Sequence, residues 1–225
     1  MKYVPKLFNT EMVKAIQALI KNQTRRTKGL KMVNENPDQW KFVSLGPNPE
    51  KENDTSLYAY FKTGLDTWTY AKAEANVGDI FWVRETWQQE CYEGDYPEGK
   101  AYIATKKYVY RADEYELPKE SKAFGKWKPS IFMPKEACRL FLEVTNVRVE
   151  RLHDISEEDA KAEGIKIYSG FEQFENYNKI GYRFLNSAID SFFSLWRSIN
   201  GKESLDANPW VFAYSFEQIE KPDNF

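Results

Sequence analysis

Two residues near the N-terminus, Lys21 and Thr24, have types and a spacing that suit nucleophilic chemistry. Lys21 follows an apolar helical pattern, and Thr24 brings a small hydroxyl three residues later. A lysine desolvated against a core can lose its proton and act as a base, and a threonine hydroxyl needs such a base to become a nucleophile. Arg25 and Arg26 could hold an anionic or carbonyl-rich ligand. This interpretation places Thr24 at a loop where side chains can converge. The structural alternative is a helix C-terminus whose cations complement the dipole and the last carbonyls.

Glu163 is a third candidate. It precedes Gly164 at the end of a short helix, which the capping box from Ser156 to Asp159 predicts. A carboxylate at a helix C-terminus is unfavourably placed in the helix dipole, which suits it to give a proton to a leaving group. A solvated carboxylate without a role fits the same pattern equally well.

Two further positions are typical of nucleic-acid contacts. Trp127 stands between Lys126 and Lys128, and Arg84 follows Trp82 in an apolar run. Aromatic rings stack on bases and cationic side chains meet phosphates, whereas core packing is the alternative and is favoured for Trp82. The chain has 32 Lys and Arg against 34 Asp and Glu, a formal charge of −2. This balance gives no argument for tight nonspecific binding of nucleic acid.

The sequence lacks the residues that common zinc and phosphate-loop sites require. The sequence has one histidine, His153, and two cysteines, Cys91 and Cys138, with no CxxC pair, so common zinc patterns are excluded. A Ser-His-Asp or Cys-His unit would depend on His153, which we expect at the surface just before a helix. No GxGxxG or GxxxxGK[ST] motif occurs. Acid–base chemistry would therefore use Lys, Glu, Asp or Tyr, and we expect no metal and no organic cofactor.

The elements that must position these residues are mostly strands, with a helix near each end. Helical spacing predicts helices at 10–21, capped by Thr10, and at 188–199. Composition predicts a strand at 80–87, and alternation predicts strands at 102–110, 139–150 and 210–216, with a bulge at Asn146. Aromatic residues could supply short strands near 58–61 and 68–70. These patterns predict an α+β fold and are compatible with a small β-barrel with flanking helices.

The chain has the composition of a folded, water-soluble protein. Hydrophobic residues make up 42% of the 225 residues and aromatic residues 16%, which is ample for a packed core. No apolar run approaches the roughly 20 residues needed to cross a bilayer, and the first residues lack the pattern of a secretory signal. We expect a cytoplasmic protein without membrane contacts.

Several runs of the sequence resemble the ASCH-domain proteins. FNTEMVKAI at 8–16 and KNQTRR at 21–26 are similar to the family's opening, whose signature reads GRKTxTxR; this chain has Leu19, Ile20 and Asn22 at three of those positions. Six further runs resemble the longer, phage- and prophage-encoded branch of the family: VGDIFWVRETW at 77–87, YRAD at 110–113, WKPSI at 127–131, LEVTNVRVERL at 142–152, ISEEDAKAEGI at 155–165 and NPWV at 208–211. The resemblance implies one PUA-like domain over residues 1–225, a small β-barrel with flanking helices and insertions near 30–76, 88–125 and 166–187.

The resemblance also implies a function. Compact members of the family include amidohydrolases that remove the acetyl group from 4-acetylcytidine with a lysine base, a threonine nucleophile and a glutamate proton donor. By motif position these roles fall on Lys21, Thr24 and Glu163. The leading hypothesis is an amide hydrolase for a modified cytosine nucleoside, in which Arg25, Arg26, Arg84 and Trp127 bind substrate. The alternatives are a non-catalytic module that binds RNA or a modified nucleotide, and a ribonuclease that uses Lys21.

Overall fold

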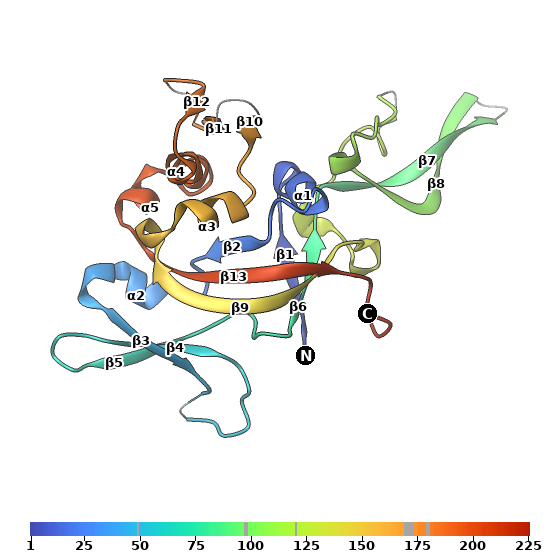
Figure 1. Ribbon diagram of the computed structural model, residues 1–225. Helices are drawn as coiled ribbons and strands as arrows, with labels where there is room; N and C mark the ends of the chain where they lie inside the picture. The colour runs from blue at the N-terminus through green and yellow to red at the C-terminus, as the bar shows by residue number, and fades with distance from the viewer. Residues whose placement is uncertain (49, 97–98, 120, 169–172, 179–180) are drawn as a thin grey trace.

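The computed structural model describes all residues of the chain except 49, 97–98, 120, 169–172 and 179–180. A five-stranded sheet lies at its centre, in the order β1-β6-β9-β13-β2 (Figure 1). Its strands are β1 (Tyr3–Leu7), β2 (Gln23–Arg26), β6 (Ile80–Arg84), β9 (Phe141–Arg151) and β13 (Trp210–Ile219). β1 runs parallel to β6, and the other neighbours are antiparallel. The α+β class predicted from the sequence is confirmed.

The central sheet is curled, but it is not a closed barrel. β1 and β2 are its two edges, and no backbone pairing joins them within the described residues. A side chain occupies the seam instead: Arg26 Nη2 donates to the Leu7 carbonyl oxygen at 3.2 Å, and the Arg26 guanidinium carbon lies 5.4 Å from the centre of the Phe8 ring. The predicted barrel is therefore wrong, because an arginine stands where backbone bonds would have to close it.

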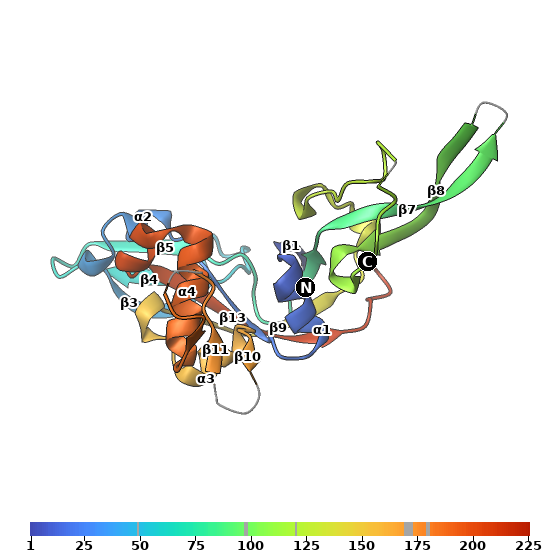
Figure 2. The same ribbon diagram turned by 90° about the horizontal axis from the view of Figure 1, so that it is seen from above.

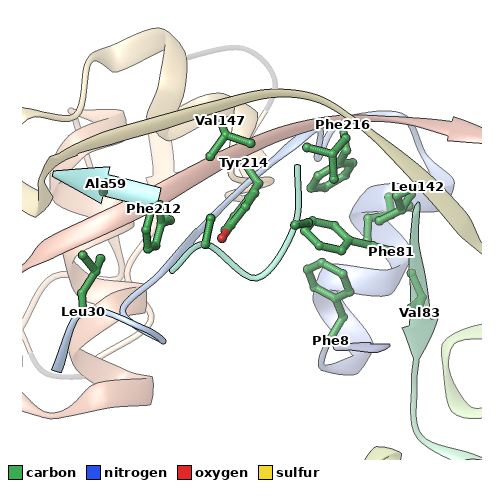
Figure 3. Close-up of a cluster of buried hydrophobic side chains, with 14 of the residues drawn as sticks. Phe8, Leu30, Ala59, Phe81, Val83, Leu142, Val147, Phe212, Tyr214 and Phe216 are labelled. Carbon is green, nitrogen blue, oxygen red and sulfur yellow. The ribbon is translucent and has the colours of Figure 1, made fainter. Parts of the chain in front are cut away.

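Aromatic side chains from distant parts of the chain fill the concave face of this sheet (Figure 3). Phe81 packs edge-on against Tyr214 with ring centres 5.4 Å apart, and Phe8 lies 6.3 Å from Phe216 in the same manner. All four residues are almost fully buried. The curvature of β9 and β13 places these rings inside the sheet rather than on a flat surface.

The predicted bulge beside Asn146 is present. The register of β9 and β13 shifts where Ser215 faces Asn146 and Phe216 faces Val144, which leaves Thr145 unpaired. An extra residue in one strand bends it and increases its twist. The bulge therefore helps to curl the sheet around its aromatic core.

The first predicted helix is shorter than its apolar pattern. α1 (Thr10–Gln17) begins with Asn9, not Thr10, as the cap: Asn9 Oδ1 accepts from the Met12 amide at 2.8 Å. Leu19 then takes a left-handed φ of 58°, and the amide of Lys21 donates to the Ala15 carbonyl at 3.0 Å. This tight turn ends the helix early and lets the chain enter β2, so the loop expected at 21–26 is instead largely a strand.

The remaining helices lie mainly on one side of the central sheet (Figures 1 and 2). α3 (Glu157–Ala162) is capped by Ser156 as predicted, and Gly164 follows its end with a φ of 81°. α4 (Ala188–Asn200) begins after Ser187. Two short helices, α2 (Lys31–Glu35) and α5 (Lys202–Asp206), complete the set together with 3-10 turns at Pro37–Gln39, Arg111–Asp113, Ser130–Phe132, Lys135–Ala137 and Leu152–Asp154.

The three segments predicted as insertions hold the smaller sheets. One sheet pairs β3 (Lys41–Gly46), β4 (Tyr58–Lys62) and β5 (Trp68–Lys72), and a second pairs β10 (Ile167–Tyr168), β11 (Gln173–Glu175) and β12 (Phe184–Leu185). β7 (Trp87–Tyr96) and β8 (Gly99–Tyr110) form a hairpin that projects from the body (Figure 2). Parts of each predicted insertion lie outside the described residues. Among the described residues, no helix combines the length and the apolar character needed to span a membrane.

Candidate functional site

A close approach between two distant segments brings Lys21 and Glu163 together. Lys21 follows the tight turn after α1, and Glu163 is the last residue before Gly164 at the end of α3. A Cβ at Gly164 would lie 2.6 Å from the Lys21 Cβ, a distance that real side chains do not tolerate. The amide of Asn22 also donates to the Ala162 carbonyl at 3.0 Å. Glycine at 164 therefore lets the end of α3 pack directly on Lys21.

The Lys21 ammonium is enclosed and fully bonded. Its Nζ lies 2.9 Å from Glu163 Oε2, 2.7 Å from the Glu163 carbonyl oxygen and 2.7 Å from the Gln23 carbonyl oxygen. An ammonium group has three protons to donate, so each has an acceptor. The Lys21 side chain is 0% exposed. Burial lowers the pKa of Lys21, against the opposing effect of the Glu163 carboxylate.

The second oxygen of Glu163 is held by Arg25. Arg25 Nη1 donates to Glu163 Oε1 at 3.0 Å, Nε donates to Glu150 Oε1 at 2.8 Å, and Nη2 donates to Asp159 Oδ2 at 2.8 Å. The Arg25 side chain is also 0% exposed. The predicted substrate-binding arginine is thus bonded on all sides to protein carboxylates, and its contacts are those of a residue that orients Glu163.

These groups belong to a charge network that balances. Arg148 bonds to Asp159 through Nη2, and its Nε lies 3.5 Å from Glu150 Oε2. Among the described residues, the network has three cations and three carboxylates: Lys21, Arg25, Arg148, Glu150, Asp159 and Glu163. Buried charges are costly unless each has a partner and further hydrogen bonds. The pairing of opposite charges explains how several ionised groups can lie beneath α3 and α4.

Thr24 lies on the other face of β2. It pairs with Tyr214 of β13, whereas its neighbours Gln23 and Arg25 pair with Ser215 and Ala213. Directly opposed residues of an antiparallel pair point to the same side of a sheet, so Thr24 shares the face of the buried Tyr214 ring. Thr24 is 0% exposed, and its Oγ1 has no hydrogen-bond partner among the described residues. The structure thus joins Lys21 to Glu163 and leaves the Thr24 hydroxyl unbonded.

A small cavity of about 90 Å³ adjoins Glu163. Arg26 and Glu163 line it together with Met12 of α1 and with Phe192 and Trp196 of α4. Since a water molecule occupies about 30 Å³ of the liquid, the cavity has room for about three. It can therefore take a small polar group or the edge of a ring in its present form. Two of the predicted binding residues, Arg25 and Arg26, border the cavity.

Arg84 and Trp127 lie elsewhere. The Arg84 guanidinium bonds to the Ile131 carbonyl oxygen and lies 5.5 Å from the Trp82 ring. Trp127 is half-buried beside the β7–β8 hairpin, where the next residue, Lys128, exchanges backbone hydrogen bonds with Trp87. Neither Arg84 nor Trp127 is among the described residues that line the cavity at Glu163.

A second buried lysine among the described residues, Lys6, was not predicted from the sequence. Its Nζ bonds to Glu74 and lies 4.5 Å from the Phe81 ring and 5.0 Å from the Tyr214 ring. Burial lowers the pKa of Lys6 from 10.5 to about 8. The alternation of Val4, Lys6 and Phe8 was the available signal, because period two puts all three on the inner face of a strand.

Comparisons of the chain with protein-family models, with curated proteins and with solved structures gave no match. The resemblance to ASCH-domain proteins therefore stays a prediction. What this site does has to be argued from the contacts of Lys21, Glu163 and their neighbours.

Proposed function

We propose that the chain is an amide hydrolase that deacylates a modified cytosine nucleoside of the 4-acetylcytidine kind, and that it uses Lys21, Thr24 and Glu163. Support comes from one observation above all: the Lys21 amine and the Glu163 carboxylate, 142 residues apart in sequence, meet at 2.9 Å in a buried site. Acid–base catalysis requires contact at hydrogen-bond distance. A buried amine–carboxylate pair is a pair of proton donor and acceptor.

The 2.9 Å contact also offers a route to the forms that the reaction needs. Transfer of one proton from Lys21 to Glu163 converts an ion pair into a neutral amine and a carboxylic acid, without a change in net charge. Burial lowers the pKa of Lys21, which favours the loss of its proton. The free amine of Lys21 can then accept a proton, and the acid of Glu163 can donate one.

The reaction follows from these two forms. Lys21 takes the proton of the Thr24 hydroxyl, and Oγ1 attacks the acyl carbonyl carbon. The carbon–nitrogen bond breaks as Glu163 gives its proton to the exocyclic nitrogen of cytosine. Water then attacks the acyl-Thr24 ester, passing one proton to the Glu163 carboxylate, while Lys21 returns a proton to Thr24 Oγ1. This sequence requires Lys21 Nζ to exchange one of its present acceptors for the Thr24 hydroxyl.

A second candidate function is a module that binds RNA or a modified nucleotide without catalysis. It is favoured by the complete bonding of the Lys21 ammonium and by the burial of Thr24 on the opposite face of β2. Such a module would use Arg26 and the ring of Trp196 in the cavity beside Glu163. A binding site that depends on phosphates loses affinity linearly on a log–log plot against salt.

The test is to incubate the purified protein with 4-acetylcytidine and to measure its deacylation by chromatography. We expect turnover that is lost in Thr24→Ala, Lys21→Met and Glu163→Gln and kept in the control Thr145→Ala, a threonine exposed on β9. Absence of turnover on all acylcytidines by folded protein, or full activity of Thr24→Ala, would overturn the hydrolase. In that case a salt titration of RNA and nucleotide binding tests the second candidate.

A further inference from the structure

The cavity beside Glu163 is the innermost of three that adjoin one another. The second has a volume of about 160 Å³ and shares Met12, Leu195 and Ile199 with the first. The third has a volume of about 580 Å³ and shares Gly164 and Tyr177 with the second. All three follow α1, which faces the layer of α3, α4 and β10 (Figure 2). The three cavities therefore lie in a row, from Glu163 to the region between α1 and β10.

The outermost cavity, which we call the outer pocket, is apolar and has no net charge. Its walls are formed by apolar side chains of α1, of the turn after α1 and of the segment after α3: Ala15, Ala18, Ile20, Ile165 and Ile167. The charged residues at its rim are two acids, Glu11 and Glu175, and two bases, Lys14 and Lys166. Such balance attracts neither a phosphate nor a cation, whereas apolar walls favour hydrocarbon. Its volume lies in the range of small-molecule sites.

Tyr177 separates the outer pocket from the middle cavity. Its Oη accepts from the Lys166 amide at 2.8 Å, and its own amide donates to Ser194 Oγ at 3.0 Å. The ring is thus anchored at both ends and borders both cavities. Gly164 also borders both cavities.

We propose that the outer pocket binds the acyl group of the substrate, so that amides of apolar acids longer than acetate are preferred. This inference rests on the hydrolase proposed above. The two ends of this row of cavities differ in a way that sets the orientation: the inner cavity presents Arg26 and Glu163, which suit the polar edge of cytosine, and the outer pocket presents hydrocarbon. A phosphate in the outer pocket would meet no net positive charge, because two acids balance the two bases.

Binding, rather than turnover, tests the pocket directly. The probes are cytidines acylated at N4 with acetyl, butanoyl or hexanoyl groups, titrated calorimetrically into the Thr24→Ala protein, which cannot form the acyl-enzyme. Each fully buried methylene adds about fourfold in affinity. Because the outer pocket is open on one side, we expect hexanoyl to bind about tenfold more tightly than acetyl.

Two matched variants locate the effect. Ile167 is 46% exposed in the outer pocket and Ile131 is 56% exposed outside it, so a glutamate is tolerated at either position. Ile167→Glu in the Thr24→Ala background should abolish the preference for hexanoyl over acetyl. Ile131→Glu should leave that preference unchanged.

The outcomes separate this inference from the hydrolase. Equal affinity for the three acyl groups, or equal effects of the two variants, overturns the acyl pocket even when the native protein deacylates 4-acetylcytidine. Graded affinity that Ile167→Glu removes supports the pocket. If the native protein then turns over none of the three amides, the outer pocket remains an acyl-binding site and the hydrolase is overturned.

Discussion

The Lys21–Glu163 contact predicts a large loss of stability when the carboxylate alone is neutralised. Glu163→Gln keeps the size of the side chain and removes its charge. It leaves the ammonium of Lys21 and the guanidinium of Arg25, both 0% exposed, without the carboxylate that bridges them. Removal of one partner from a buried ion pair costs about 3–5 kcal/mol. At about 2–4 °C per kcal/mol for a chain of this size, the melting temperature should fall by roughly 6–20 °C.

Urea unfolding followed by circular dichroism and tryptophan fluorescence measures this cost. Glu158→Gln is the matched control, since Glu158 is exposed on the same helix, and we expect it to change the unfolding free energy by less than about 0.5 kcal/mol. The double variant Lys21→Met/Glu163→Gln leaves no lone charge. Its loss of unfolding free energy should therefore be smaller, by at least about 1 kcal/mol, than the sum of the losses in the two single variants. A Glu163→Gln protein as stable as the Glu158→Gln control would refute an ionised Lys21–Glu163 pair in the resting protein.

Two other predictions concern packing and pH. Gly164→Ala and Gly78→Ala both place a Cβ at a φ near 80°, which costs about 1–2 kcal/mol. The Cβ at position 164 also meets Lys21, whereas the Cβ at position 78 has open space. In urea unfolding, the Gly164 variant should therefore lose at least about 1 kcal/mol more unfolding free energy than the Gly78 variant. Lys6 is protonated in the unfolded chain up to its ordinary pKa of 10.5 and in the folded protein up to about 8. Between these pH values the unfolded state binds more protons, so the unfolding free energy of the native protein, measured relative to Lys6→Met, should rise by about 3 kcal/mol from pH 8 to pH 10.5. A flat difference over that range would contradict the lowered pKa.

The parts of the fold that follow local periodicity could be predicted from the sequence. The alternation of 139–150 and 210–216 gave β9 and β13, and the helical spacing of 188–199 gave α4, each within a few residues. Ser156 and Gly164 delimit α3 because a cap and a left-handed stop are local chemistry. These elements carry the frame on which Glu163 is held.

What could not be predicted depends on contacts between distant residues. The apolar pattern of α1 continues through Leu19 and Ile20, but these side chains are 77% and 51% exposed, because the turn that leads into β2 interrupts the helix. Arg25 has the sequence context of an exposed cation, and three carboxylates 125 to 138 residues away bury it. No local pattern encodes such partners. The burial of Arg25 and the open seam of the central sheet therefore could not be predicted from the periodicity of the sequence.

The side chains of β2 alternate between the two faces of the central sheet. Gln23 and Arg25 point toward the carboxylates of α3 and β9, whereas Thr24 points toward the aromatic core. Lys21 precedes the strand, and its Nζ lies 2.9 Å from Glu163 Oε2. In the resting structure it serves the Glu163 face. In the proposed hydrolase, Lys21 would have to turn from Glu163 toward Thr24, whereas the proposed recognition site at Arg26 would not require this movement.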